Sequence, residues 1–434
     1  MKRLLNQQRR QRGAATLVVV MVLFLVMALL AAYANRSLMF EQRISGSYYR
    51  ASMAQEMAEG GIDWTVAMLN GPAADNSCNA VATGGTRFVD RYLNVSAADR
   101  AVLPVGSTPV APAVDCVRDG SDLVCRCAAP DTRTAQPATT VANSLAPSFL
   151  VALGSNTTVQ YGSFSVTAIG CTDSSADSCN RQSHVRSESF LGASNLDAAI
   201  AFVAAVPSSP ATPLTVKGAL TSSGAGGLGL HNTDPTTGGG LLVSGGATAA
   251  LDSSRMDTLP GTPPAQALRF SDSTLQGMDD KQFFQTFMGM APARYRNHPA
   301  LRTVTCAAGA DCGPALQAAY ASGVRILRVP GALTIGSNVA IGTPSDPLLV
   351  VAEGAVTLTG PMQLTGMLVA LGNLSWTNTG GLTSVINGMV TVQGSMQTNG
   401  RMDIVYQQEI ANQLRNRIGS YVRISGGMRD LAIN

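Results

Sequence analysis

The sequence predicts an α+β protein in three parts: a long N-terminal helix that crosses a membrane, a small antiparallel sheet, and a C-terminal parallel β-helix (solenoid) capped by a helix. Three observations lead to this prediction. An uncharged apolar segment follows a basic start, an amphipathic helical pattern continues that segment, and β-branched runs ending in glycine recur through the second half of the chain.

The first of these features is the N-terminus. Residues 1–13 carry five Lys or Arg side chains and no acidic one. Residues 14–34 contain no charge, and as a helix they are about 31 Å long, enough to cross the hydrocarbon core of a bilayer. The basic flank stays cytoplasmic by the positive-inside rule. We therefore expect a single membrane span, with the rest of the chain exported.

Three interpretations of this N-terminus compete. It is a plain signal anchor, a secretory signal peptide cut after Ala32-Tyr33-Ala34, or a short leader ending at Gly13 whose removal leaves the apolar helix in the mature protein. The apolar run is longer than the 7–15 residues typical of a signal peptide, which counts against the second interpretation.

The helical pattern does not stop at the end of the span. In residues 35–70 apolar positions recur at steps of mostly three to five, as in an amphipathic helix, and Gly71-Pro72 ends the pattern. Residues 14–69 thus predict one helix of about 84 Å. A secreted protein has no need of such a helix fused directly to its signal, so the third interpretation is favoured.

These residues carry a resemblance to a known family. The basic leader ending in Gly13 before Ala14, the stretch Glu41-Gln42-Arg43-Ile44-Ser45-Gly46, and the later Ala54-Gln55-Glu56-Met57-Ala58-Glu59 resemble the PilX-type minor pilins of type IV pili, although Glu41 and Gln42 are swapped relative to the family pattern. The resemblance implies cleavage after Gly13 by the prepilin peptidase and N-methylation of Ala14. It also implies assembly with other minor pilins and the major pilin, and transfer from the inner membrane to the pilus and cell surface.

The fifth position of the mature chain departs from the major pilins. They have glutamate there, whose partner is thought to be the N-terminal amine of a neighbouring subunit, whereas this sequence has Val18. A carboxylate in a membrane is tolerated only with a partner. Pseudopilins at a filament tip are similar in lacking this glutamate, so Val18 favours a tip or initiating subunit. The alternative is that Val18 is one more lipid-facing residue.

Residues 71–195 predict a small disulfide-bearing head, with short strands at residues 148–153, 163–170 and 182–190. All eight cysteines follow the span, on the side where disulfides form. Close spacing predicts local bridges Cys171–Cys179 and Cys306–Cys312. The remaining four leave three connectivities open, with the near neighbours Cys125 and Cys127 each expected to bond elsewhere, to Cys78 or Cys116.

Residues 196–434 predict the β-helical domain. Glycines 331, 354, 372 and 394 end successive β-branched runs about 20 residues apart, which is typical of stacked rungs. An ordinary β-sandwich is the alternative, although its strands recur every 8–12 residues. Amphipathic helices at residues 275–290 and 314–321 interrupt the pattern, and residues 406–418 with the tail 421–431 are expected to cap its end.

Composition excludes several classes of function. A formal net charge of +3 and three histidines argue against nucleic-acid binding and against histidine-based catalysis or metal binding. Residues 329–400 hold only two acids, Asp346 and Glu353, too few for glycosidic acid–base chemistry. Paired Cys-x2-Cys zinc ligands are missing from the sequence. We therefore expect no catalytic residue, no metal and no cofactor. The competing function is an anchored, exported β-helix adhesin or carbohydrate-active protein.

Overall fold

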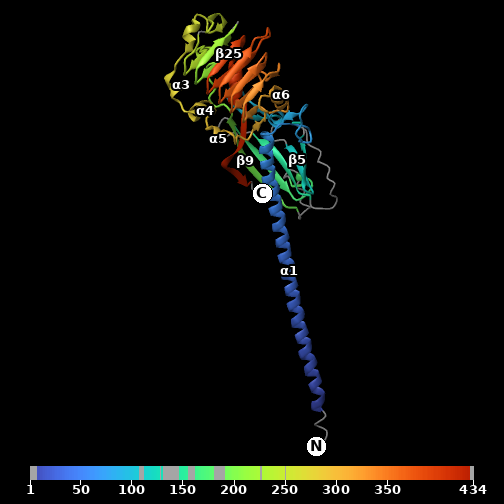
Figure 1. Ribbon diagram of the computed structural model, residues 1–434. Helices are drawn as coiled ribbons and strands as arrows, with labels where there is room; N and C mark the ends of the chain where they lie inside the picture. The colour runs from blue at the N-terminus through green and yellow to red at the C-terminus, as the bar shows by residue number, and fades with distance from the viewer. Residues whose placement is uncertain are drawn as a thin grey trace.

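A computed structural model describes residues 7–106, 112–127, 129–130, 146–154, 162–179, 191–224, 227–249 and 251–430. Side chains are described from residue 15 onward within these ranges, apart from those of 112, 113, 177 and 178. The predicted strand at residues 182–190 lies outside the described residues. The protein is a long helix carrying a mixed α/β body with several sheets, as Figure 1 shows.

One helix, α1 (Gln7–Leu69), forms the stem of the molecule. It is unbroken at Gly46 and at Gly60-Gly61, where glycine weakens a helix. Its N-terminal half projects away from the body and its C-terminal half lies against it (Figure 1). The helix predicted for residues 14–69 is therefore present and ends at the predicted residue.

The part of the body nearest the stem is an antiparallel six-stranded sheet. Its order is β27-β9-β8-β7-β5-β6. The strands are β5 (Pro112–Asp119), β6 (Asp122–Cys127), β7 (Ser148–Gly154), β8 (Ser163–Cys171), β9 (Ala193–Ala204) and β27 (Gly419–Asp430). Alternating burial along β8 and β9 gives the sheet one apolar face, and α1 covers it.

Short elements connect α1 to this sheet. They are β1 (Ala73–Ala74), β2 (Thr86–Arg87), α2 (Phe88–Tyr92), β3 (Leu93–Val95) and β4 (Val102–Pro104). Phe88 and Tyr92 of α2 are buried and join the same apolar core as α1, so these elements close one side of the head.

The far part of the body contains parallel strands only, in two sheets. The larger sheet follows the order β14-β12-β26-β24-β22-β20-β17-β16, and β10, β13, β15 and β19 pair beside this path. Its strands are β10 (Leu214–Val216), β12 (Leu228–His231), β13 (Leu242–Ser244), β14 (Met256–Asp257), β15 (Leu268–Arg269), β16 (Leu301–Thr303), β17 (Ile326–Val329), β19 (Ala340–Ile341), β20 (Leu348–Ala352), β22 (Gln363–Ala370), β24 (Val385–Val392) and β26 (Met402–Val405).

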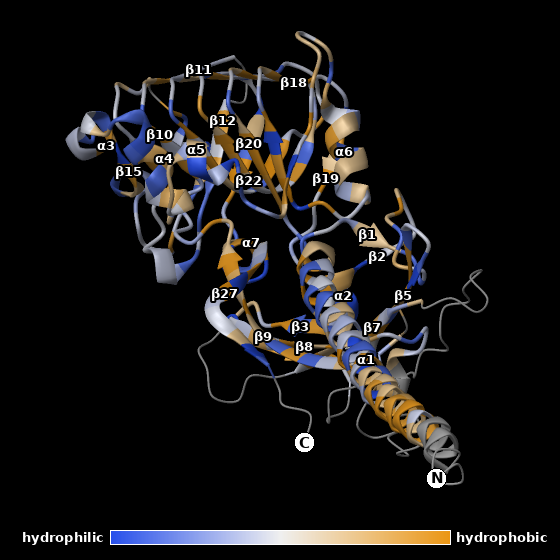
Figure 2. Cartoon of the chain, turned by 90° about the horizontal axis from the view of Figure 1, so that it is seen from below, coloured by the Kyte–Doolittle hydropathy of each residue, from blue (hydrophilic) through white to orange (hydrophobic). Residues whose placement is uncertain are grey.

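The second parallel sheet lies opposite the first and shares its apolar core. Its order is β11-β25-β23-β21-β18. Its strands are β11 (Leu220–Ser223), β18 (Leu333–Ile335), β21 (Val356–Thr359), β23 (Leu374–Asn378) and β25 (Met396–Gly400). Figure 2 shows the two sheets at one end of the body. Trp376 is fully buried in the core between them.

Glycines stack at the corner where the chain passes from one parallel sheet to the other. A Cβ on Gly354 would lie 2.7 Å from Gly331, and one on Gly372 would lie 2.7 Å from Gly354. The column continues from Gly372 to Gly394 and then to Gly218, with the Gly218 amide donating to the Gly394 carbonyl at 3.0 Å. The recurrent glycines of the sequence are therefore positions where one chain segment lies directly on the next.

The parallel β-helix itself is not confirmed. Parallel pairing and stacked corners agree with it, but the strands do not stack in chain order. Leu214 of β10 pairs with Val390 of β24, so the first parallel strand lies beside a late one. Strands as short as two residues, including β14 and β15, lie on and beside the larger sheet, which is not built of equal rungs.

Helices cover the outer face of the larger parallel sheet rather than its end. α4 (Asp280–Met288), α5 (Pro292–Tyr295) and α7 (Gln408–Asn416) share an apolar cluster with Leu349, Met367 and Met389. The helix predicted at residues 275–290 is split into α3 (Ser273–Gly277) and α4, because Asp279 caps the second helix. α6 (Gly313–Ala321) matches the second predicted insertion.

The prediction that the C-terminal segments cap the parallel strands is wrong. The helix expected at residues 406–418 is α7, which packs on the face of the sheet through Ile410 and Leu414. The tail expected to complete the cap is β27, which pairs with β9 in the antiparallel sheet. The alternating apolar residues of the tail fit a sheet edge, so the chain returns to the head instead of ending on the parallel strands.

Candidate functional site: the N-terminal helix and its attachment

The N-terminal half of α1 exposes apolar side chains around its circumference. The helical segment Ala15–Leu69 contains an 18-residue window of mean hydropathy 3.0, none of it buried, and is long and apolar enough to cross a membrane. Phe24 is 71% exposed and Leu30 is 64% exposed. This half is the apolar end of α1 in Figure 2. Such a surface is stable only when lipid or other helices surround it.

The residues expected to be processed lie at the free end of this helix. The backbone is helical through Gly13 and Ala14, and Val18 follows about one turn later with 58% of its surface exposed. All three lie at the end of α1 farthest from the body (Figure 1). The structure therefore separates them from the expected cysteine pairs, which lie in the body.

The C-terminal half of α1 packs closely on the antiparallel sheet. Ala54, Ala58 and Ile62 are fully buried. A Cβ on Gly170 of β8 would lie 1.9 Å from the carbonyl oxygen of Ala54, so only glycine lets the helix backbone come this near. Small residues on both surfaces thus attach the helix rigidly to the sheet.

Asn70 fastens the end of the helix to the far end of the chain. Its side-chain amide donates to the Tyr421 carbonyl at 2.8 Å, and its side-chain oxygen accepts from the Tyr421 amide at 2.8 Å. Arg302 donates to the Asn70 carbonyl at 2.9 Å. The helix, the C-terminal strand and the parallel part of the body therefore meet at this residue. Nothing in the local sequence around Asn70 marks this role.

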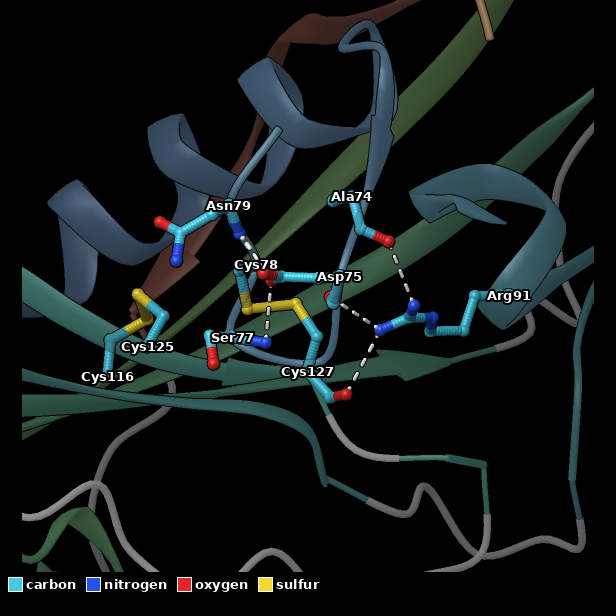
Figure 3. Close-up of a disulfide and its surroundings, with 9 residues drawn as sticks. All are labelled: Ala74, Asp75, Ser77, Cys78, Asn79, Arg91, Cys116, Cys125 and Cys127. Atoms are coloured by element: carbon cyan, nitrogen blue, oxygen red, sulfur yellow. Dashed lines mark hydrogen bonds between the residues drawn. A yellow bond between two sulfur atoms is a disulfide. The ribbon is translucent and has the colours of Figure 1, made fainter. Parts of the chain in front are cut away.

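Four disulfides stabilise the body. Two join close cysteines, Cys171–Cys179 and Cys306–Cys312. The connectivity that the sequence left open is Cys78–Cys127 and Cys116–Cys125, and Figure 3 shows these two bridges near each other. Cys125 and Cys127 bond to different partners because the register of β5 and β6 places Cys116 opposite Cys125 and Val114 opposite Cys127, so Cys127 has no cysteine across the pair and bonds to Cys78 instead.

Arg91 holds that same loop in place. Its guanidinium donates to the carbonyls of Ala74, Asp75 and Cys127 at 3.0–3.1 Å, as Figure 3 shows. The Asp75 carboxylate accepts from the amides of Ser77 and Asn79 at 2.8 and 2.9 Å. The loop after α1 is thus fixed by a disulfide, a guanidinium and a carboxylate together.

The two acids expected to be too few for catalysis serve as ion-pair partners. Asp346 accepts from Arg325 at 2.8 and 2.6 Å. Burial acts to raise the pKa of Asp346, but the Arg325 hydrogen bond and the charges of Arg87 and Arg325 outweigh it and hold the pKa below its usual value. Arg328 and Arg296 do the same for Glu353. Within the described ranges, no group of three or more His, Cys, Asp or Glu could hold a metal.

The comparison with known families decides the nature of the helix. Residues 12–63 match the family model described as PilX N-terminal. The chain carries the N-terminal helix of a PilX-type pilin. The matched segment includes the Gly13–Ala14 junction, the whole exposed apolar half of the PilX-type helix, and Ala54 and Ala58 where this helix enters the head. No curated protein and no solved structure matches the chain.

Proposed function

We propose that this protein is a minor pilin that primes or caps type IV pilus assembly and exposes its β-rich body at the filament tip, where it supports adhesion or motility. The single observation that carries the proposal is the match of residues 12–63 to the PilX N-terminal family on a helix whose apolar half is exposed. A helix of this kind anchors the subunit in the inner membrane and later packs among other pilin helices.

The position at the tip rests on Val18 and on the size of the body. Val18 offers no carboxylate for the N-terminal amine of a neighbouring subunit, and the first subunit of a filament has no earlier amine to pair. The body also extends well beyond the end of α1 and is far wider than the helix (Figure 1). A filament end accommodates such a body without a subunit stacked above it.

Processing and partners follow from the same proposal. The prepilin peptidase cleaves after Gly13, Ala14 becomes the methylated N-terminus, and the basic leader remains cytoplasmic. The subunit then contacts other minor pilins and the major pilin through its apolar helix. Its role is structural, without catalysis or cofactor.

We also propose that the chain folds as a leader (1–13), a pilin helix (14–70), a disulfide-bearing head (71–195) and a β-helical domain (196–434), of which β9 and the tail pair in the head sheet. Support for a β-helix comes from the stacked glycine corner and the parallel registers that align Val356 with Leu374 and Leu374 with Met396.

The experiment that tests processing is mass spectrometry of the mature N-terminus. We expect a chain beginning at a methylated Ala14. A Gly13→Val variant should keep the leader because the peptidase must accommodate the residue before the cut, while the neighbouring Gln11→Ala variant should be processed normally. A chain beginning at Asn35 would instead indicate secretion, and an intact Met1 would indicate a signal anchor carrying an exported adhesin or carbohydrate-active protein.

A second measurement tests the tip position. Immunogold labelling of sheared pili should place the protein at filament ends. A Val18→Glu variant should reduce that labelling or move it into the shaft, whereas Val20→Glu, which adds the same charge elsewhere in the span, should impair insertion without moving the label. Labelling along the shaft in the wild type would contradict the tip role.

A further inference from the structure

A polar groove lies on the parallel part of the body, away from the pilin helix. Its volume is about 480 Å³, and it follows strands β12, β14, β24 and β26. Most of the residues that line it are polar or charged, and they include His231, Arg255, Asp257, Arg401, Asp403 and Tyr406. The volume lies within the roughly 300–1,000 Å³ that is common for sites of small ligands.

Three neighbouring strands bring one histidine between two carboxylates in this groove. His231 Nδ1 lies 2.6 Å from Asp257 Oδ2, and His231 Nε2 lies 3.1 Å from Asp403 Oδ1. Arg255 Nη2 donates to the same Asp403 oxygen at 2.5 Å. Parallel pairing of β14, β12 and β26 produces this meeting of residues far apart in the sequence.

Gly229 makes room for the cluster. It lies on β12 opposite Asp403, and a Cβ there would be 2.0 Å from Asp403 Oδ1 and 2.9 Å from His231 Nε2. The Asp403 carboxylate therefore lies across bare backbone, which opens the groove along the strand.

A structural role, in which side-chain pairs hold neighbouring strands together, accounts for only part of the cluster. It explains Asp403, which pairs with both Arg255 and His231, and the one Asp257 oxygen that lies against His231. It does not explain the second oxygen of Asp257, whose side chain is 70% exposed, or Arg401, an exposed residue whose guanidinium has no hydrogen bond or ion pair among the described contacts. Asp257 therefore offers an acceptor oxygen and Arg401 offers N–H donors, so the groove contains available groups of both charges.

The mixture of charges selects the class of ligand. An anion would face Asp257 and Asp403, and a cation would face Arg255 and Arg401. A hydroxyl group both donates and accepts hydrogen bonds, so a polyhydroxylated neutral ligand can use both kinds of side chain. Val385, Val405 and the Tyr406 ring add apolar surface suited to the C–H face of a sugar.

We propose that this groove binds a neutral glycan, with one or two sugar rings held between the Asp257 carboxylate and the Arg401 guanidinium. The site is separate from the pilin helix, so glycan binding does not depend on the assembly role, and either proposal can fail while the other stands.

The test uses the full-length protein in detergent micelles on immobilised glycans. The probes are neutral oligosaccharides of hexoses and N-acetylhexosamines, with sialylated, sulfated and cationic amino-sugar oligosaccharides for comparison. Asp257→Asn and Arg401→Gln each remove one charge from an exposed side chain, so folding is preserved. Asp122→Asn on β6 and Arg429→Gln on β27 remove the same charges from exposed positions of the antiparallel sheet and serve as matched controls.

We expect the wild type to bind neutral glycans, each groove variant to weaken binding at least about tenfold, and both controls to bind as the wild type does. Thermal unfolding of all five proteins should agree, which separates lost binding from lost folding. No binding to neutral glycans, binding only to charged probes, or unchanged binding by both groove variants would each overturn the proposal.

Discussion

Asn70 joins three parts of the molecule: the end of α1, the C-terminal strand and the parallel part of the body. Its side chain is buried, with 7% exposed, and it bonds both the backbone N–H and the backbone carbonyl of Tyr421 in the C-terminal strand. Its own carbonyl accepts from Arg302. Loss of a buried amide that pairs with backbone in this way leaves a backbone donor and a backbone acceptor without these partners.

Replacing Asn70 with alanine should lower the free energy of unfolding by about 2–4 kcal/mol, because the Tyr421 amide and carbonyl lose their partners while they remain buried. Denaturant unfolding of the full chain in detergent measures this loss. Asn79→Ala removes an exposed amide in the following loop and should change stability by less than about 0.5 kcal/mol. Equal stability of the two variants would contradict the role assigned to Asn70.

His298 should make stability depend on pH. Burial lowers its pKa to about 4, whereas the unfolded chain has the usual value near 6.5. Between these values the unfolded state binds the extra proton, so stability falls as the pH falls from about 6.5 to 4, by up to roughly 3 kcal/mol. In His298→Gln this part of the slope should disappear. A variant with the same slope as the wild type would show that other groups cause it.

At the scale of elements, the attachment of α1 depends on close contact between backbones. Gly170 on β8 and Ala54 and Ala58 on α1 leave no room for a side chain between helix and sheet. Trp64 lies against Phe149 and Phe88 at ring-centroid distances of 5.9 and 5.8 Å, so its fluorescence reports on the same contact.

Gly170→Ala should therefore lift the helix and lower the free energy of unfolding by about 1–3 kcal/mol, with a change in Trp64 emission. Gly46→Ala provides the matched control, because a Cβ at Gly46 meets nothing within 4 Å. That control should stabilise the helix by up to about 1 kcal/mol. A neutral effect of Gly170→Ala would mean that the sheet yields without cost.

The sequence predicted those features whose pattern lies within one short stretch of the chain, and it missed those that join distant segments. Helix α1 was predicted because its periodicity and its Gly71-Pro72 end lie in one continuous stretch. The disulfides between close cysteines are present for the same reason. Pairing of Cys78 with Cys127, of β27 with β9, and of His231 with Asp403 joins distant segments, and no local pattern carries that information. The prediction of a cap was wrong because an amphipathic helix can pack on the face of a sheet as well as on its end.

At the scale of the whole molecule, the disulfides should differ in their contribution. Cys78–Cys127 spans 49 residues and Cys306–Cys312 spans 6. Chain entropy assigns about 4 kcal/mol to the first and about 2 kcal/mol to the second. Replacing both cysteines of each pair with serine and measuring denaturant midpoints tests this order. A larger loss from the Cys306–Cys312 double variant would show that local contacts, rather than loop length, set the difference.

The order of strands also determines when a chain that emerges N-terminus first can fold. Strand β10 pairs with the nearby β13 but gains its second neighbour only when β24 is available, and β12 likewise pairs with β14 and waits for β26, so both strands keep an open edge until most of the chain is present. The antiparallel sheet gains its last strand even later, from residues 419–430. Such long-range pairing is slow, and unpaired edges invite aggregation while it proceeds. The second half of the chain can therefore complete its sheets only after residues 385–430 are present, and shielding its open strand edges until then should raise the yield of folded protein.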